Sequence, residues 1–171
     1  LQVEQRVSVE RFKTWGTVDA RVVNEPQRIV RTTDLKYGAG VPVSAIGNAQ
    51  LRTYALGVYE EVSLFADIEF VETAIVQPRV DSITTERLTV AELLAWADET
   101  APILEVARYD TNPALNPGPK QCRFCRAKPD CPAIRNLVVD TTGVVFENLE
   151  ASPAERLAAV LPRLDMIEDW C

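Results

Sequence analysis

Apolar and polar residues alternate along the first third of the chain, a pattern typical of strands with one buried face. The alternation is regular over residues 3–9, and β-branched residues dominate residues 17–23 and 28–33. Asn-Glu-Pro-Gln at 24–27 is a turn sequence, because proline fixes the backbone and asparagine can bond its own main chain. The pattern therefore predicts three sequential strands joined as a meander.

The spacing of apolar residues changes from two to about 3.6 after residue 48, which indicates a helix over 48–65. Its predicted apolar stripe consists of Leu51, Tyr54, Ala55, Val58 and Val62. A strand over 67–77, ended by Pro78, and a hairpin partner over 83–88 follow this helix. Strands come first and helices later, so the expected class is α/β (α+β).

Two capping boxes predict the starts of further helices. Thr-Val-Ala-Glu at 89–92 opens a helix that we expect to reach about Arg108. Ser-Pro-Ala-Glu at 152–155 opens another, with proline at its first helical position. The predicted apolar face of this last helix comprises Leu157, Val160, Leu161, Leu164 and Ile167.

Residues 110–119 contain three prolines and a glycine, which cannot continue a helix or a central strand. We therefore expect an ordered loop or a linker there, with a cysteine cluster directly after it. The predicted organisation is a core over 1–109, a proline- and cysteine-rich segment over 110–140, and a helical segment over 141–171 that packs on the core.

With 171 residues and 47% hydrophobic content, the chain is long enough for one hydrophobic core. The tryptophans, Trp15, Trp96 and Trp170, are expected to be packing residues. The formal net charge is −7, from 18 basic and 25 acidic residues, which argues against a protein held on nucleic acid by overall charge. One basic patch over 120–135 remains compatible with DNA. Its basic members are Lys120, Arg123, Arg126, Lys128 and Arg135, and Asp130 is its one acid.

No run approaches the roughly 20 apolar residues of a membrane span, and no signal-peptide pattern is present. We therefore expect a cytoplasmic protein that makes no membrane contact. The chain begins at Leu1 and stops at Cys171 after a helical pattern, so we expect a fragment. It contains no histidine, which excludes Ser-His-Asp and Cys-His nucleophiles and imidazole zinc sites within these residues.

Two acids and a lysine lie close together on the predicted second and third strands. Asp34 and Lys36 are two residues apart and point to the same face, and Asp19 lies inside the neighbouring strand. Such charges are costly to bury unless a ligand uses them, and carboxylates suit Mg²⁺ or Mn²⁺. We expect Asp19, Asp34 and the Leu35 carbonyl to bind metal. Lys36 would then orient or help deprotonate the attacking water and stabilise developing charge.

Gln50 and Tyr54 lie one helical turn apart, so both side chains project from one face of the predicted helix. An amide and a phenol there can hold a phosphate or a base. Taken alone, the acid–lysine pair would be a surface ion pair, Asp19 an exposed strand residue and the amide–phenol pair a helix flank. Their order along the chain favours a functional site.

Cys122, Cys125 and Cys131 form a Cys-x2-Cys-x5-Cys pattern beside the prolines. An intracellular location disfavours disulfides. Cys-x2-Cys serves both iron–sulfur and zinc sites, so both cofactors remain open. The basic residues between the cysteines indicate either a DNA-guiding surface or a merely solvated one.

The ordered set Gly16-x-x-Asp19, Asp34-x-Lys36 and Gln50-x-x-x-Tyr54 resembles the PD-(D/E)XK nuclease superfamily, specifically its RecB-like branch. The cysteine triplet is similar to that of the AddB-type and CRISPR-associated iron-sulfur exonucleases. Asp-Leu-Lys-Tyr-Gly at 34–38 and Ile-Val-Gln-Pro-Arg at 75–79 resemble a family of phage and prophage proteins in this group. The resemblance spans roughly residues 4–170.

This resemblance implies a restriction-endonuclease-like core with a central mixed sheet flanked by helices. It implies a Mg²⁺- or Mn²⁺-dependent deoxyribonuclease, an exonuclease of phage recombination or DNA processing in the host-cell cytoplasm. The implied partners are DNA and phage recombination or single-strand-binding proteins. The cysteines would hold a 4Fe-4S cluster, or Zn²⁺, with a fourth ligand outside this chain. The implied catalytic residues are Asp19, Asp34, Lys36, Gln50 and Tyr54.

The sequence departs from the family pattern in two respects. The family fold opens with a helix that contributes an acid or histidine to the metal site, and Glu4 or Glu10 would have to replace that residue here. The fourth cluster cysteine of the family lies far upstream of the nuclease motifs. Cys171 is the candidate substitute here, although its place forty residues downstream of the triplet does not match that pattern. The alternative function is a non-catalytic DNA-binding or assembly module that keeps the nuclease fold, and a third is an inert structural fragment.

Overall fold

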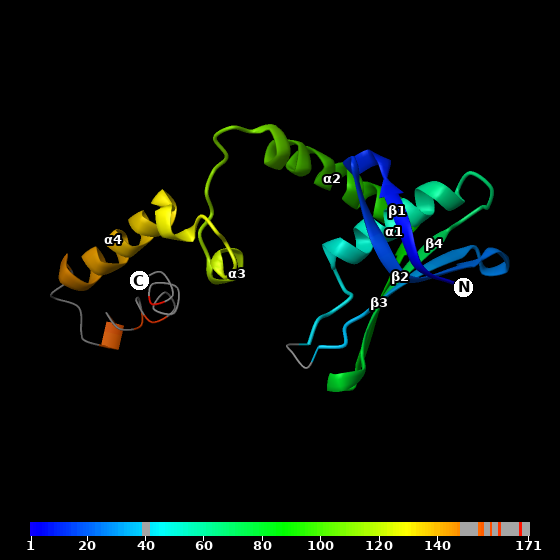
Figure 1. Ribbon diagram of the computed structural model, residues 1–171, viewed down its shortest axis with the longest axis horizontal. Coiled ribbons are helices and arrows are strands. Elements are labelled where there is room, and N and C mark those ends of the chain that lie inside the picture. Colours follow the sequence, from blue (N-terminus) through cyan, green and yellow to red (C-terminus); the bar gives the residue numbers. More distant parts are fainter. Residues whose placement is uncertain (39–41, 148–153, 156–157, 159–160, 162–167, 169–171) are drawn as a thin grey trace. The chain divides into compact units, whose positions relative to one another are not determined.

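The computed structural model describes residues 1–38, 42–147, 154–155, 158, 161 and 168. It divides the chain into two compact units, Leu1–Asp110 (unit 1) and Thr111–Cys171 (unit 2), drawn in Figure 1. Within the described residues, no helix is long and apolar enough to cross a membrane.

Unit 1 is built on a five-stranded mixed sheet whose strands lie in sequence order, which confirms the predicted α/β class. Neighbouring strands are antiparallel except β3 and β4, which are parallel. A parallel pair needs a crossover connection, and helix α1 (Ala49–Val62) provides it. The strands are β1 (Gln2–Val9), β2 (Thr14–Asn24), β3 (Ile29–Leu35), β4 (Phe70–Gln77) and β5 (Ser82–Thr89).

The three antiparallel connections share one design, a single turn of 3₁₀ helix followed by a residue in the left-handed region. These turns are η1 (Glu10–Phe12), η2 (Glu25–Gln27) and η3 (Pro78–Val80). The left-handed residues that follow them have φ near 50°, and they are Lys13, Arg28 and Asp81. The predicted turn at 24–27 is confirmed, and the Asn24 side chain accepts a bond from the Gln27 N–H at 3.3 Å.

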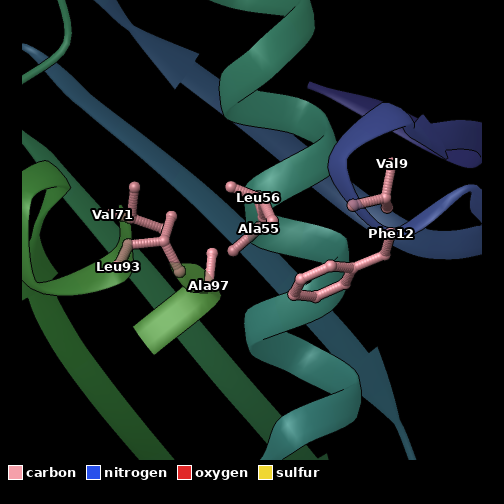
Figure 2. Packing of buried hydrophobic residues seen from close by; sticks show 7 residues of the cluster. All are labelled: Val9, Phe12, Ala55, Leu56, Val71, Leu93 and Ala97. Carbon is pink, nitrogen blue, oxygen red and sulfur yellow. The ribbon is translucent and has the colours of Figure 1, made fainter. Parts of the chain in front are cut away.

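Helices α1 and α2 (Val90–Tyr109) pack on the same face of the sheet. Figure 2 shows Ala55 and Leu56 of α1 between Phe12 on one side and Leu93 and Ala97 of α2 on the other. The helix starts follow the sequence signals, because Asn48 caps α1 and the predicted capping box of Thr89 and Glu92 is present. Helix α1 ends three residues before the predicted position 65. The reason is that Leu64 and Phe65 lie beyond the core and are 84% and 70% exposed.

The opposite face of the sheet carries exposed side chains. Trp15, on this face, is 61% exposed with the Arg6 guanidinium 4.0 Å from its ring centroid, so its expected role as a packing residue is wrong. Trp96 does pack, edge-on against Phe12 with ring centroids 5.7 Å apart. Trp170 lies outside the described residues.

Two ion pairs tie α1 to the sheet. Arg21 of β2, itself buried, forms a bidentate pair with Glu61 at 2.6 and 2.8 Å. The hydrogen bond from Arg21 lowers the pKa of Glu61, against an opposing effect of burial. Near the start of the helix, Arg52 of α1 pairs with Glu86 of the edge strand β5. Hydrogen bonding from Arg52 is likewise the main cause that lowers the pKa of Glu86, and the Gly47 N–H adds to it.

These two carboxyls predict a loss of stability in acid. Their folded-state pKa values lie below the ordinary 4.5, so the unfolded chain takes up protons first as the pH falls. The stabilisation is therefore complete above about pH 4.5 and is lost as the pH drops through the lowered values. Measured between pH 7 and pH 3, the melting temperature should fall less steeply in Glu86→Gln than in the wild type. An equally steep fall in both proteins would contradict this account.

Unit 2 contains helices α3 (Pro119–Cys122) and α4 (Pro132–Glu147), with the turn η4 (Lys128–Asp130) between them. Cys122 and Ile134 are buried together, and Cys131, Leu137 and Val138 pack against them. Most of the predicted final helix, including Ser152 and Pro153 of its capping box, lies outside the described residues. Leu161, predicted on its apolar face, is described and is 53% exposed.

Candidate functional site

Asp34 lies on β3, one residue before the end of that strand, and is only 6% exposed. Lys36 Nζ donates a hydrogen bond to Oδ1 at 3.0 Å. It also lies 2.8 Å from Oδ2, but that contact is an ion pair without hydrogen-bond geometry. Among the described residues, Oδ2 is therefore a buried carboxylate oxygen without a hydrogen-bond partner, and the Lys36 ammonium balances its charge.

Asp19 lies directly beside Asp34. The antiparallel register pairs Ala20 with Thr33, which places Asp19 opposite Asp34 one step further along. Asp19 Oδ2 accepts a hydrogen bond from the Leu35 N–H at 2.7 Å. Both predicted carboxylates thus lie at the peptide group that joins Asp34 to Leu35. Leu35 contributes the N–H of this group to Asp19. Metal binding by the Leu35 carbonyl stays a prediction.

Tyr54 projects from α1 onto strand β2. Its ring lies so close to Gly16 that a Cβ atom at this position would overlap it, which gives the Gly-x-x-Asp motif a physical reason. The half-buried Tyr54 packs against the cluster that contains Val18, next to Asp19. Its phenol oxygen accepts a bond from the exposed Gln50 Nε2 at 3.1 Å, so the two predicted residues form one group.

Three residues that precede α1 are held by side chains that the sequence analysis missed. The Val43 N–H donates to Gln77 Oε1 at 2.7 Å, and the Ala45 N–H donates to Thr84 Oγ1 at 2.9 Å. The Gly47 N–H donates to Glu86 Oε1 at 2.9 Å. Backbone N–H groups two residues apart are thus tied to β4 and β5, which sets where α1 begins and where Gln50 projects. One sequence signal could have indicated these anchors. Residues 77, 84 and 86 are polar, although they lie on the sheet face that α1 covers, together with the buried Ile75.

The two residues considered for the acid that the family's first helix supplies, Glu4 and Glu10, lie in different places. Glu10 sits in the turn after Val9, at the far end of the β1–β2 hairpin from Asp19, so the structure does not bring it to the site. Glu4 falls opposite Asp19 in the β1–β2 register, between the pairs Val3–Ala20 and Gln5–Val18. Its backbone is left-handed, with φ of 49°, which is strained for a residue other than glycine.

The cysteine segment forms a turn in which a backbone N–H donates a hydrogen bond to a cysteine sulfur. Cys122 Sγ accepts the Gly118 N–H at 3.3 Å, and the Cys125 N–H bonds the Cys122 carbonyl at 3.2 Å. Cys122 is buried, Cys131 is partly buried and Cys125 is exposed, and all three are free thiols. Cys171, considered as a fourth ligand, lies outside the described residues.

A family model described as protein of unknown function (DUF2800) matches residues 1–171. The chain belongs to this family. The DUF2800 match covers both units, so the sheet with its acids and the cysteine segment belong to one family sequence.

The side chains of this DUF2800 chain that could bind a metal are few, but Mg²⁺ needs few protein ligands. Among the described residues, no three His, Cys, Asp or Glu side chains are gathered as a metal site. Mg²⁺, however, is usually held by one or two carboxylates, with water and substrate phosphates as its other ligands. Asp19 and Asp34 fit this requirement for one or two carboxylates, and one oxygen of Asp34 has no hydrogen-bond partner among the residues that the structure describes.

Proposed function

We propose that this protein is a metal-dependent DNA nuclease of the PD-(D/E)XK superfamily, RecB-like branch, which hydrolyses phosphodiester bonds. The observation that carries the proposal is Asp34 Oδ2, a buried carboxylate oxygen that pairs with Lys36 and has no hydrogen-bond partner among the described residues. Asp19 bonds the N–H of the next residue, Leu35. Two acids and a lysine in this arrangement suit phosphodiester hydrolysis, which needs a bound cation, an oriented water and a stabilised anionic transition state.

The topology of unit 1 supports the same proposal. A three-stranded antiparallel meander, a crossover helix and a parallel fourth strand follow one another. The acids lie on β2 and β3, and the amide–phenol pair lies on the crossover helix. The three motifs that resemble the superfamily are thus neighbours in space as well as ordered in sequence.

Asp34 and Asp19 would hold Mg²⁺ or Mn²⁺. The cation would supply Lewis-acid stabilisation of the charge that develops on the phosphate. Lys36, with its side chain 38% exposed, contacts Asp34 and also reaches solvent, so its ammonium can orient a water molecule and stabilise negative charge. Gln50 and Tyr54 would position the substrate, because an amide and a phenol both donate hydrogen bonds to phosphate oxygens.

We propose further that the cysteines bind a 4Fe-4S cluster, or alternatively Zn²⁺, together with a ligand outside the described residues. The Gly118 N–H bond to Cys122 Sγ supports this, because hydrogen bonds to sulfur stabilise and tune metal-bound thiolates. Cys122→Ser should then lose stoichiometric iron or zinc, measured by elemental analysis of anaerobically purified protein. Arg123→Gln is the matched control. Wild-type protein with neither metal would contradict this proposal.

The cellular role rests on the resemblance to phage and prophage proteins. We propose an exonuclease of phage recombination or DNA processing, acting beside recombination or single-strand-binding proteins. The exposed basic side chains of Arg123 and Arg126 would guide DNA, although the overall charge is −7.

The nuclease proposal is tested by adding metal to a preformed complex. The protein is mixed with labelled DNA in EDTA, and Mg²⁺ or Mn²⁺ is then added in excess. Nuclease function predicts binding before metal addition and cleavage after it. Binding that persists with intact DNA in both metals would support the alternative, a DNA-binding or assembly module without catalysis.

A further inference from the structure

We propose that Tyr37 and Arg79 form a clamp that holds an unpaired nucleotide of the DNA strand next to the cleavage site. The inference rests on the proposed nuclease function and adds a substrate class to it: DNA with a single-stranded end. Tyr37 and Arg79 lie in the segments 34–38 and 75–79 that resemble the phage and prophage family, but neither belongs to the proposed catalytic set of acids, lysine, amide and phenol.

The first observation is position. Strands β3 and β4 are parallel, so their carboxyl ends lie at the same edge of the sheet. The Lys36 N–H bonds the Val76 carbonyl at 2.9 Å and continues this pairing just past β3. Tyr37 follows Lys36, and Arg79 lies in η3 directly after β4. Tyr37 is three residues from Asp34, about 10 Å along an extended backbone, so the clamp lies within a few nucleotides of the acids.

The second observation is the contact between the two side chains. The Arg79 guanidinium carbon lies 5.3 Å from the centroid of the Tyr37 ring, a cation–π distance. Tyr37 is nevertheless 65% exposed, and Arg79 is exposed as well. The pair therefore presents an aromatic ring and a cation to solvent together.

The third observation is charge. Most arginines of unit 1 form ion pairs with carboxylates, and these are Arg11, Arg21, Arg28, Arg31, Arg52 and Arg108. Arg79 forms no ion pair with any residue that the structure describes. Its positive charge is therefore available to a phosphate, with which a guanidinium makes strong, often bidentate, hydrogen bonds.

The backbone on the β4 side of the clamp is fixed before any substrate binds. Gln77, only 2% exposed and two residues before Arg79, accepts a hydrogen bond from the Val43 N–H, which ties the end of β4 to residue 43. The left-handed Asp81 closes η3 after Arg79, with its N–H bonded to the Pro78 carbonyl. A preorganised pair loses less conformational entropy when it binds a ligand.

This chemistry favours an unpaired nucleotide. An exposed aromatic ring gains binding energy by stacking on the face of a base, and a cation beside it contacts the backbone. Within a duplex, neighbouring base pairs cover those faces. A strand end or overhang, in contrast, can place one base on Tyr37 and its phosphate on Arg79.

The test measures DNA binding by fluorescence anisotropy in EDTA, where no cleavage occurs, with a labelled single strand and a blunt duplex. Tyr37→Leu should weaken single-strand binding about tenfold. Tyr37→Phe, which keeps the aromatic ring, should bind the single strand like the wild type. Arg79→Gln should make the slope of log affinity against log salt concentration less steep by about 0.7. Duplex affinity should stay unchanged in the Tyr37 variants.

Arg87→Gln is the matched control, because Arg87 also lies over an aromatic ring, that of Phe70, but on β5 away from this edge. It should bind like the wild type. Wild-type affinity in Tyr37→Leu and Arg79→Gln, with cleavage by the wild type intact, would overturn the clamp and leave the nuclease proposal standing. An equal loss on the blunt duplex would overturn the preference for an unpaired nucleotide. A wild type that neither binds nor cleaves DNA would overturn both proposals.

Discussion

Asp34→Asn is expected to reduce metal-dependent DNA cleavage by about a thousandfold or more while leaving the melting temperature close to that of the wild type. A thousandfold loss corresponds to about 4 kcal/mol of transition-state stabilisation, of the size expected when a metal ligand is lost. Folding should hardly change, because asparagine has the same shape and removes a buried charge that lacks a full set of hydrogen bonds. Lys36 stays solvated, since its side chain is 38% exposed.

The matched control for this variant is Glu72→Gln. Glu72 is an acid of the same sheet, on β4, but it points to the opposite face and pairs with Arg31 at 2.8 Å. Cleavage should be unchanged in this control. If Asp34→Asn retained Mn²⁺-dependent cleavage near the wild-type rate, Asp34 would not be a catalytic residue. If instead it failed to fold, as judged by circular dichroism, the buried ion pair would be structural.

Gly57→Ala is expected to destabilise unit 1 by about 2 kcal/mol, although the same change stabilises most helices by about 1 kcal/mol. The reversal follows from how closely α1 approaches β1. A Cβ atom on Gly57 would lie 2.6 Å from the Ser8 carbonyl oxygen and 2.9 Å from Val9 Cγ2. The oxygen belongs to strand backbone and cannot move aside cheaply, so α1 would have to shift away from the sheet.

Thermal or chemical unfolding followed by circular dichroism measures this effect. Gly143→Ala, in α4, is the control, because a Cβ atom there would meet nothing within 4 Å. It should leave the unfolding of unit 1 unchanged. A Gly57→Ala protein at least as stable as the wild type would show that α1 does not pack this closely on β1.

Local patterns predicted most of unit 1. Alternation, β-branched runs and turn residues together located all five strands, and the boundaries differ by at most three residues, as for β2, which begins at Thr14 instead of residue 17. The capping box at Thr89 fixed the start of α2, because it depends on residues adjacent in sequence. Features set by long-range packing were harder to predict. Trp15 was predicted to pack because it is large and apolar, yet its strand face is exposed.

The candidate site shows the same division. The spacing of Asp34 and Lys36 placed both on one strand face, and their ion pair follows from it. The bond between Asp19 and the Leu35 N–H depends on the register of two strands, which the sequence does not specify. The anchoring of Val43 by Gln77 joins residues 34 positions apart, and no local signal predicts such a contact.

The central claim is that a divalent cation binds beside Asp34 Oδ2, and titration of Mn²⁺ followed by electron paramagnetic resonance tests it most directly. Bound and free Mn²⁺ give different signals, so the measurement needs neither DNA nor turnover. The account predicts saturable binding of Mn²⁺ to the wild type, competed by Mg²⁺ and lost in Asp34→Asn, with Glu72→Gln unaffected. Equal Mn²⁺ binding by the wild type and Asp34→Asn, or none by the wild type, would contradict it.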